Sequence, residues 1–207
     1  ASAILYTLGK RHGAIRPAQL LLAGVVLNSL FSALILAINS MADFLESYGI
    51  LFWLLGSLAA RDPGSIAVLT VIAAAGVGLL LYDARRLNLL ALDDASAHSL
   101  GVHLAAVRRR AFLATCLIGA AAVSASGLIG FVGLIVPHVV RLLIGPDHRL
   151  LIPASIVAGA GFLALADAVA RTALAPVELP VGVITALLGG PFFLYLLRRT
   201  RAGENFE

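Results

Sequence analysis

Long stretches without any charged residue dominate the pattern of the chain. A bilayer core about 30 Å thick needs roughly 20 helical residues to cross it, and Pro17 to Ala42 and Pro63 to Tyr82 are both long enough and uncharged. The stretches lack the alternation of barrel strands, so they predict helices and an all-α fold. The predicted spans are 19–39, 63–82, two within 111–144, 150–166 and 179–197.

The longest apolar stretch is too long for a single membrane-spanning helix. Ala111 to Pro137 carries no charge, and apart from His138 and Arg141 the apolar character continues to Ile144. One perpendicular helix of that length would overshoot the bilayer. Glycines permit a sharp turn and a close helix contact, so the stretch is predicted to form one full span and one shorter span. The residues assigned to this break are Gly127, Gly130, Gly133 and Pro137.

Basic residues gather between the predicted spans and set the orientation. Cytoplasmic loops of membrane proteins carry an excess of Lys and Arg. Six crossings place every basic residue except Arg61 and Arg171 on the cytoplasmic side, together with the C-terminus, and a single span over 111–144 would spoil this alternation. The predicted fold is therefore a polytopic transmembrane helical bundle forming one domain over residues 1–207.

Composition agrees with a membrane protein. Hydrophobic residues make up 60% of the chain and charged residues 13%, where a soluble domain has about a quarter charged; the mean hydropathy is +1.00. The net charge of +4 could suggest nucleic acid, but the basic residues lie in short groups between apolar windows, so no nucleic-acid partner is expected. The single cysteine, Cys116, lies inside an apolar window and is interpreted as a small buried side chain.

Two connecting segments are longer than simple turns. Residues 40–62 contain a 14-residue uncharged run, Ser47 to Ala60, which predicts an interfacial or partly inserted helix on the outer side with Tyr48 and Trp53 near the headgroups. Residues 83–110 form the longest polar stretch and predict one or two short helices on the inner side. The chain opens on an apolar run ending at Lys10 and Arg11, from which we expect that an N-terminal part is absent.

Several segments resemble one transporter family. They are SGLIGFVGLIVPHVVRLLIGPDHRLLIPAS (126–155), LADAVART (165–172), ELPVGVITALLGGPFFLYLLRR (178–199), LLLAGVVLNSLFSALI (20–35) and FWLLGSLA (52–59). In this order they are similar to the FecCD family, the permease subunits of type II ABC importers for ferric siderophores, haem and cobalamin. The resemblance covers nearly the whole chain and implies the C-terminal two-thirds of a ten-span, BtuC-like subunit, of which about six spans are present.

The resemblance also implies partners. A permease of this family forms a homodimer in the bacterial inner membrane with two cytoplasmic ATP-binding subunits and a periplasmic substrate-binding protein. ATP and Mg would be bound by the partner ATPase, because the chain has no G-x-x-x-x-G-K-[ST] phosphate loop. No cofactor, metal site or enzymatic activity is expected of the chain itself. Ferric siderophore or haem is the favoured cargo, with cobalamin as the third possibility.

The resemblance assigns an ATPase-coupling role to the inner segment 91–103, which matches the family's coupling helices. A force-transmitting contact needs a stiff element, and this is the one long internal segment; the alternative is an ordinary solvated loop. The residues assigned to coupling are Ala95, Ser96, Ser99, Leu100, Gly101 and Val102.

Arg171 and Arg61 are the two outward basic residues, and family members use arginines at the place of Arg171 to pair with acidic residues of the binding protein. Electrostatic docking suits a partner that must land in one orientation. The alternative for Arg171 is an ion pair with Asp167 one turn back, or snorkelling to lipid headgroups. Arg61 is the weaker match, because Asp62 adjoins it.

The first full span matches the family's pathway-lining helix. Its polar residues Asn28, Ser29 and Ser32 are assigned to the translocation pathway, with hydrogen bonding to a neighbouring helix as the equal alternative. The loop before it falls at the family's cytoplasmic gate. Small hydroxyl residues are common in that loop, and here Arg16, Pro17 and Ala18 stand instead, so the gating chemistry is not carried over in detail.

Two other functions fit the sequence less well. Ser124, Ser126 and His138 superficially suggest an intramembrane hydrolase, but no oxyanion donor or orienting partner is evident. His138 is instead interpreted as structural, because a haem or iron site would need a second ligand nearby. An ion-coupled secondary transporter would use charges inside its spans, and Asp167, near an outer end, is the one candidate.

Overall fold

The computed structural model describes residues 10–11, 14–15, 17–59, 62–90 and 104–203. Its chain divides into two compact units, Ala1–Leu51 and Phe52–Glu207. In the first unit, strands β1 (Lys10–Arg11) and β2 (Ala14–Ile15) form an antiparallel hairpin in which Lys10 faces Ile15. Helix α2 (Pro17–Asn39) follows, and the boundary between the units falls within helix α3 (Phe44–Leu54). Apart from this short pairing, all the regular structure in the described residues is α-helical, which confirms the predicted all-α fold.

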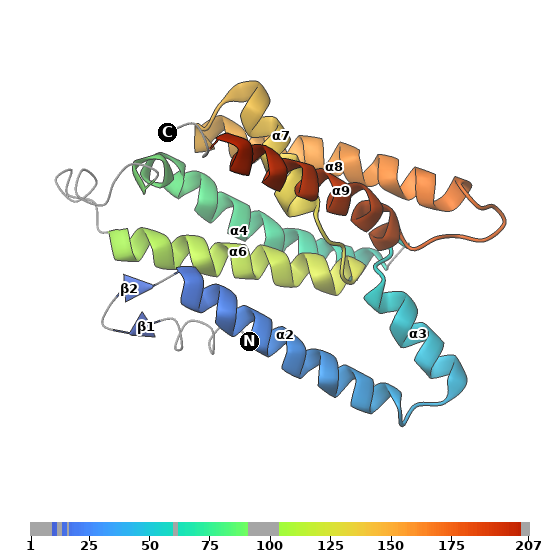
Figure 1. Ribbon diagram of the computed structural model, residues 1–207. Helices are drawn as coiled ribbons and strands as arrows, with labels where there is room; N and C mark the ends of the chain where they lie inside the picture. The colour runs from blue at the N-terminus through green and yellow to red at the C-terminus, as the bar shows by residue number, and fades with distance from the viewer. Residues whose placement is uncertain (1–9, 12–13, 16, 60–61, 91–103, 204–207) are drawn as a thin grey trace. The chain divides into compact units, whose positions relative to one another are not determined.

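Five helices of the described residues pack as a bundle in the second unit (Figure 1). They are α4 (Pro63–Leu90), α6 (Leu104–Ser126), α7 (Val132–Ile144), α8 (His148–Thr172) and α9 (Val181–Gly203). Helix α8 packs against α4, α7 and α9, and α4 also packs along α6. The contact between α4 and α8 therefore joins the α4–α6 pair to the rest of the bundle.

A seam of small residues brings α4 and α6 together. On α6, Val107, Ala114 and Ala121 recur every seven residues and are nearly fully buried, which places them on one face. On α4, Gly76 and Asp83 are also buried and seven residues apart. A methyl group at Gly76 would overlap the side chain of Ile118, 2.6 Å away. The absence of a side chain there lets the two helices approach closely.

Two small apolar clusters form the core around α8. One joins Ala166 and Ala170 of α8 to Val181 and Ile184 of α9, and the other joins Leu151 of α8 to Val136 and Val140 of α7. Outside these clusters, large apolar side chains are exposed on every helix of the bundle, as with Leu143 and Val157. A lipid-facing exterior accounts for this distribution, because lipid tails are as apolar as the side chains.

Within the described residues, three helices are long and apolar enough to cross a bilayer: Leu22–Asn39, Pro63–Leu90 and His148–Thr172. They coincide with three of the predicted spans. Val132–Ile144 and Val181–Leu196 are shorter apolar helices, and the uncharged part of α6 follows its three arginines. The complete count of six crossings therefore stays a prediction.

Two details of the sequence prediction were wrong. Residues 83–90 and 104–110 are not short separate helices, because α4 continues to Leu90 and α6 already starts at Leu104. Only two of the four residues assigned to the helix break lie at the break. Gly127 (φ 71°) and Gly130 lie between α6 and α7, but Gly133 and Pro137 are within α7. Pro137 is accommodated in the second turn of that helix rather than ending it.

Candidate functional site at the basic end of the bundle

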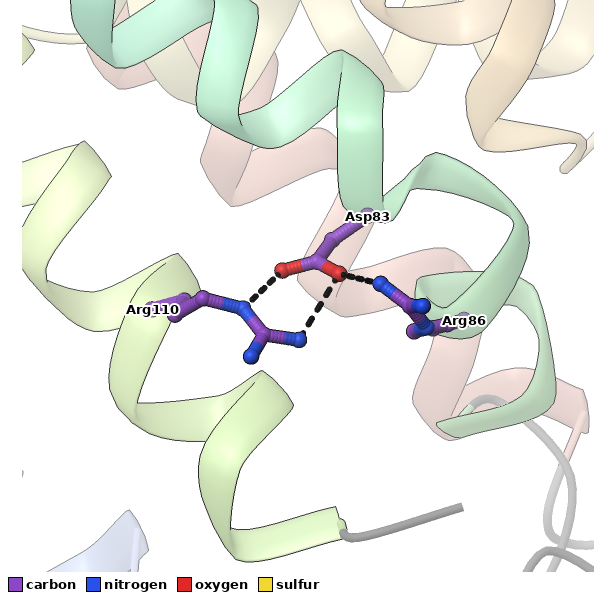
Figure 2. A network of polar contacts seen from close by, with 3 residues as sticks. All are labelled: Asp83, Arg86 and Arg110. Atoms are coloured by element: carbon purple, nitrogen blue, oxygen red, sulfur yellow. Dashed lines mark hydrogen bonds and ion pairs between the residues drawn. The ribbon is translucent and has the colours of Figure 1, made fainter. Parts of the chain in front are cut away.

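A buried carboxylate joins α4 to α6. Asp83 is only 1% exposed, and its Oδ1 accepts hydrogen bonds from Nη2 of Arg110 at 2.9 Å and from Nη1 of Arg86 at 2.7 Å. The Nε of Arg110 donates to the other carboxylate oxygen (Figure 2). The fork of Arg110 thus holds both oxygens of Asp83, the arrangement that makes arginine–carboxylate pairs strong and directional.

The helix pattern explains why Asp83 is buried. It lies two turns after Gly76 on the face of α4 that meets α6. An unpaired carboxylate in that seam would be costly, and Arg110, between Val107 and Ala114 on α6, supplies the counter-charge. The guanidinium of Arg86 also lies 5.1 Å from the ring of Tyr82, so α4 contributes its own cation to the cluster.

A second polar cluster joins α4 to the start of α8. Nδ2 of Asn88 donates to Oδ1 of Asp147 at 2.7 Å, and Oδ1 of Asn88 accepts from the backbone N–H of His148 at 2.8 Å. The same Asn88 oxygen lies 2.7 Å from Nδ1 of His148. Since this oxygen can only accept, that contact requires the hydrogen on Nδ1.

Asp147 is the N-cap of α8, and its Oδ1 accepts from the N–H of Arg149 at 2.9 Å. The first N–H groups of a helix have no partner within it, so a capping carboxylate is favourable. The amide of Asn88 and then the N–H of Arg149 hold the pKa of Asp147 below its ordinary value. The carboxylate is therefore ionised at neutral pH.

These contacts place the end of α4 and the starts of α6 and α8 at one end of the bundle (Figure 1). This end also holds Arg85, Arg108 and Arg109. The charge asymmetry that the sequence predicted is therefore present in the second unit, with the basic residues at the end where α4 and α6 are joined.

The opposite end is held by close backbone contacts. The N–H of Ser57 donates to the carbonyl of Ser126 at 2.8 Å. Methyl groups at Gly127 and Gly182 would overlap the carbonyl oxygens of Trp53 and Leu55. The turn after α3, the break between α6 and α7, and the start of α9 therefore meet where only glycine fits.

Arg171 lies at this second end and is already paired. Its Nε donates to Oδ2 of Asp167 at 2.8 Å, one turn back on α8. Its side chain is 44% exposed, and four further N–H donors remain on the guanidinium. The helical ion pair weighed in the sequence analysis is thus present, and docking of a partner by Arg171 stays a prediction. Arg61 lies outside the described residues.

The predicted pathway residues Asn28, Ser29 and Ser32 are all exposed on α2. The hydroxyl of Ser29 donates to the carbonyl of Val25 at 3.0 Å, within its own helix. Pro17 and Ala18 of the predicted gate loop are helical and form the first turn of α2, where proline is well tolerated; their role in gating stays a prediction. Arg16 and the six residues assigned to ATPase coupling lie outside the described residues.

His138 and Ser126 make contacts that are typical of structural residues. The ring of His138 packs edge-on against Phe192, with ring centroids 6.2 Å apart, and the hydroxyl of Ser126 donates to the carbonyl of Ala122. In the part of the chain that the structure describes, no three His, Cys, Asp or Glu side chains lie close enough to hold a metal ion.

Both polar clusters of the basic end were missed in the sequence analysis. In the sequence analysis, Arg86 and Arg110 are treated only as basic residues of the inner side, and no role is assigned to Asp83 or Asn88. A signal was available for Asp83: it stands directly after the uncharged window 63–82 and in helical register with Gly76. Nothing in the sequence could have indicated that Asn88 meets Asp147 across 59 positions.

Apolar exposed helices, a basic end and a glycine-packed opposite end define a multi-pass membrane protein. The sequence matches the FecCD transport family over residues 1–199. It is 42% identical to the hemin transport system permease protein HmuU of Yersinia pestis, covering 97% of this chain and 60% of that protein. It is also 42% identical to the cobalamin import system permease protein BtuC of Halobacterium salinarum, covering 96% and 53%.

A further relative is the iron(3+)-hydroxamate import system permease protein FhuB of Bacillus subtilis, 40% identical over 93% of this chain and 50% of that protein. Among solved structures, an inward-facing conformation of a metal-chelate type ABC transporter matches with a TM-score of 0.85 and 35% identity, covering 96% of this chain and 63% of that one. The chain belongs to the FecCD transport family, a family of transport permeases and not of enzymes. It spans about half to three-fifths of the length of these curated relatives.

Proposed function

We propose that this chain is part of the membrane-spanning permease subunit of an ABC importer, which moves a ferric siderophore, haem or cobalamin from the periplasm to the cytoplasm. The observation that carries the proposal is the match over residues 1–199 to the FecCD family. Its relatives include permeases for hemin, cobalamin and iron hydroxamate at similar identity. Hydrolysis of ATP, with Mg, would take place on a partner subunit.

The assembly follows from the same proposal. Two copies of the permease would form a homodimer in the bacterial inner membrane, with two cytoplasmic ATP-binding subunits and a periplasmic substrate-binding protein. The basic end would face the cytoplasm, as the excess of Lys and Arg on the cytoplasmic side favours, and the C-terminus would be cytoplasmic. Segment 91–103 would then contact the ATP-binding subunits, and Arg171 would face the binding protein.

The joined ends of α4 and α6 support coupling at segment 91–103. Asp83 and Arg110 hold the two helices seven residues before Leu90 and six residues after Leu104, about 10 Å of helix on either side. A contact made between these two helix ends would act on a fixed pair of helices. A loop without this support could move without displacing the two helices.

The test is ATP-driven uptake by the complete importer in liposomes, supplied in turn with a ferric siderophore, haem and cobalamin. We expect uptake of one class that requires ATP, the ATP-binding subunits and the binding protein. Uptake driven by a proton gradient without the ATP-binding subunits would instead establish the secondary transporter considered in the sequence analysis.

A further inference from the structure

The start of α8 is capped by side chains from two different helices. Asp147 satisfies the N–H of Arg149 from within its own turn, while Asn88, near the end of α4, satisfies the N–H of His148 and bonds Asp147 as well. A helix normally finds these partners locally or in water. Here α4 completes the cap, so the position of α8 depends on the position of α4.

Asn88 and Asp83 act on different faces of the same helix. They are five residues apart on α4, which separates them by about 140° around the helix axis. Asp83 bonds Arg110 of α6, and Asn88 bonds the start of α8. The last two turns of α4 therefore fix two neighbouring helices at once.

Helix α8 carries this connection to the other end of the bundle. Its 25 residues extend about 37 Å. Its far end bears the pair Asp167 and Arg171 and accepts a backbone hydrogen bond at Ala170 from Leu179. A displacement of its first turn would reach the opposite face as a movement of one stiff element.

We propose that Asn88 is a positioning residue that couples the basic end of the bundle to α8, so that docking at the far end and ATP hydrolysis at the basic end influence each other. This inference rests on the proposed function, in which the two ends face the binding protein and the ATP-binding subunits. Coupling between two sites is reciprocal. A broken connection should therefore lower the stimulation of ATP hydrolysis by the binding protein more than the basal rate.

The geometry offers a sharp variant and its own rescue. Asn88→Asp places two carboxylates where an amide now donates to Asp147. The double variant Asn88→Asp with Asp147→Asn exchanges the two groups. Residue 147 can then donate to residue 88, while residue 88 still accepts from the N–H of His148. The bond from the N–H of Arg149 is given up, because one oxygen of Asp147 accepts from both Asn88 and Arg149 in the native protein, so the double variant restores the link between α4 and α8 and not the whole cap. Arg109→Gln removes an exposed charge at the same end and is the matched control.

The experiment measures basal and binding-protein-stimulated ATP hydrolysis by the purified complete importer in liposomes, with thermal unfolding in parallel. Asn88→Asp should reduce the ratio of stimulated to basal rate by at least about fivefold, the lower range of measured coupling effects. The double variant should restore the ratio to within about twofold, and Arg109→Gln should leave it unchanged.

Two results would overturn the inference. An unchanged ratio in Asn88→Asp would show that the connection does not transmit, and an equal fall in both rates with a lowered unfolding temperature would show that Asn88 serves stability alone. If the unsubstituted importer shows no stimulation by a binding protein, the proposed function fails instead, and the two failures are thereby distinguished.

Discussion

Asp83 of α4 and Arg110 of α6 are held together by a two-pronged ion pair although 27 positions separate them in the chain. The carboxylate is buried in the helix seam, and the guanidinium reaches it from the partly exposed start of α6 (Figure 2). The pair thus joins the two helices close to where α4 ends and α6 begins.

Loss of this ion pair should destabilise the permease. Arg110→Gln leaves the buried carboxylate of Asp83 with Arg86 alone, and removing one partner of a buried pair is strongly unfavourable. We expect the unfolding midpoint of the detergent-solubilised importer to fall by roughly 5 °C or more. Arg109→Gln changes the same charge on an exposed neighbour and should shift the midpoint little. Equal shifts for the two variants would contradict the assignment.

The glycine contacts at the opposite end should make folding sensitive to a side chain at Gly127. Gly127 has φ 71° and faces the carbonyl of Trp53, so Gly127→Ala combines backbone strain with overlap. The strain alone is about 1–2 kcal/mol. We expect a sharp loss of folded protein in the membrane fraction, measured by fluorescence-detected size exclusion. Gly130→Ala is the control, because open space surrounds Gly130; a similar loss there would argue against this packing.

The cap of α8 should make the thermal stability of the protein depend on pH. Hydrogen bonds lower the pKa of Asp147 in the folded protein, so its ionisation stabilises the fold above the ordinary carboxyl value of about 3.9. That contribution disappears as the pH falls through the lower, folded pKa. At pH 6, the unfolding midpoint of the native protein should be higher than that of Asp147→Asn. The difference between the two midpoints should become smaller below about pH 4. A gap independent of pH would exclude this effect.

Arg171 should contribute to docking of the binding protein. Arg171→Glu reverses a charge that is exposed beside Asp167, and complementary charges steer such encounters. We expect affinity for the binding protein to fall about tenfold at low salt and the difference to shrink at high salt. Asp167→Asn keeps the arginine and should bind normally. Unchanged affinity of Arg171→Glu at low salt would leave Arg171 with its helical ion pair alone.

The coupling role of segment 91–103 has its own test. Gly101→Pro introduces a residue that restricts the backbone and removes an N–H donor. Leu100→Asp places a charge at a position that matches the family's coupling helices. Both variants should reach the membrane in normal amounts, measured by immunoblotting, and lose at least about nine-tenths of ATP-driven uptake if coupling there supplies 1.4 kcal/mol or more. Normal uptake by both variants would refute the assignment.

Much of the fold could be predicted because a bilayer imposes a simple rule on sequence. Uncharged windows of about 20 residues correspond to helices, and α2, α4 and α8 were found where such windows lie. The turn at Gly127 was also indicated, since a stretch as long as 111–144 exceeds one span. Helix ends were less predictable: charges at Arg85 and Arg86 suggested a loop, yet α4 continues past them to Leu90.

The amino-acid sequence alone is enough to predict the membrane-embedded, all-α character of the chain, the gathering of basic residues between its spans and its resemblance to a transporter family. The first two properties are local, because each depends on hydropathy or charge within one window, and the resemblance depends on the order of motifs along the chain. The tertiary structure decided which polar residues meet. Asp83 with Arg110, and Asn88 with Asp147, are pairs from different parts of the chain, and only the packing of α4 against α6 and α8 brings their side chains within hydrogen-bonding distance.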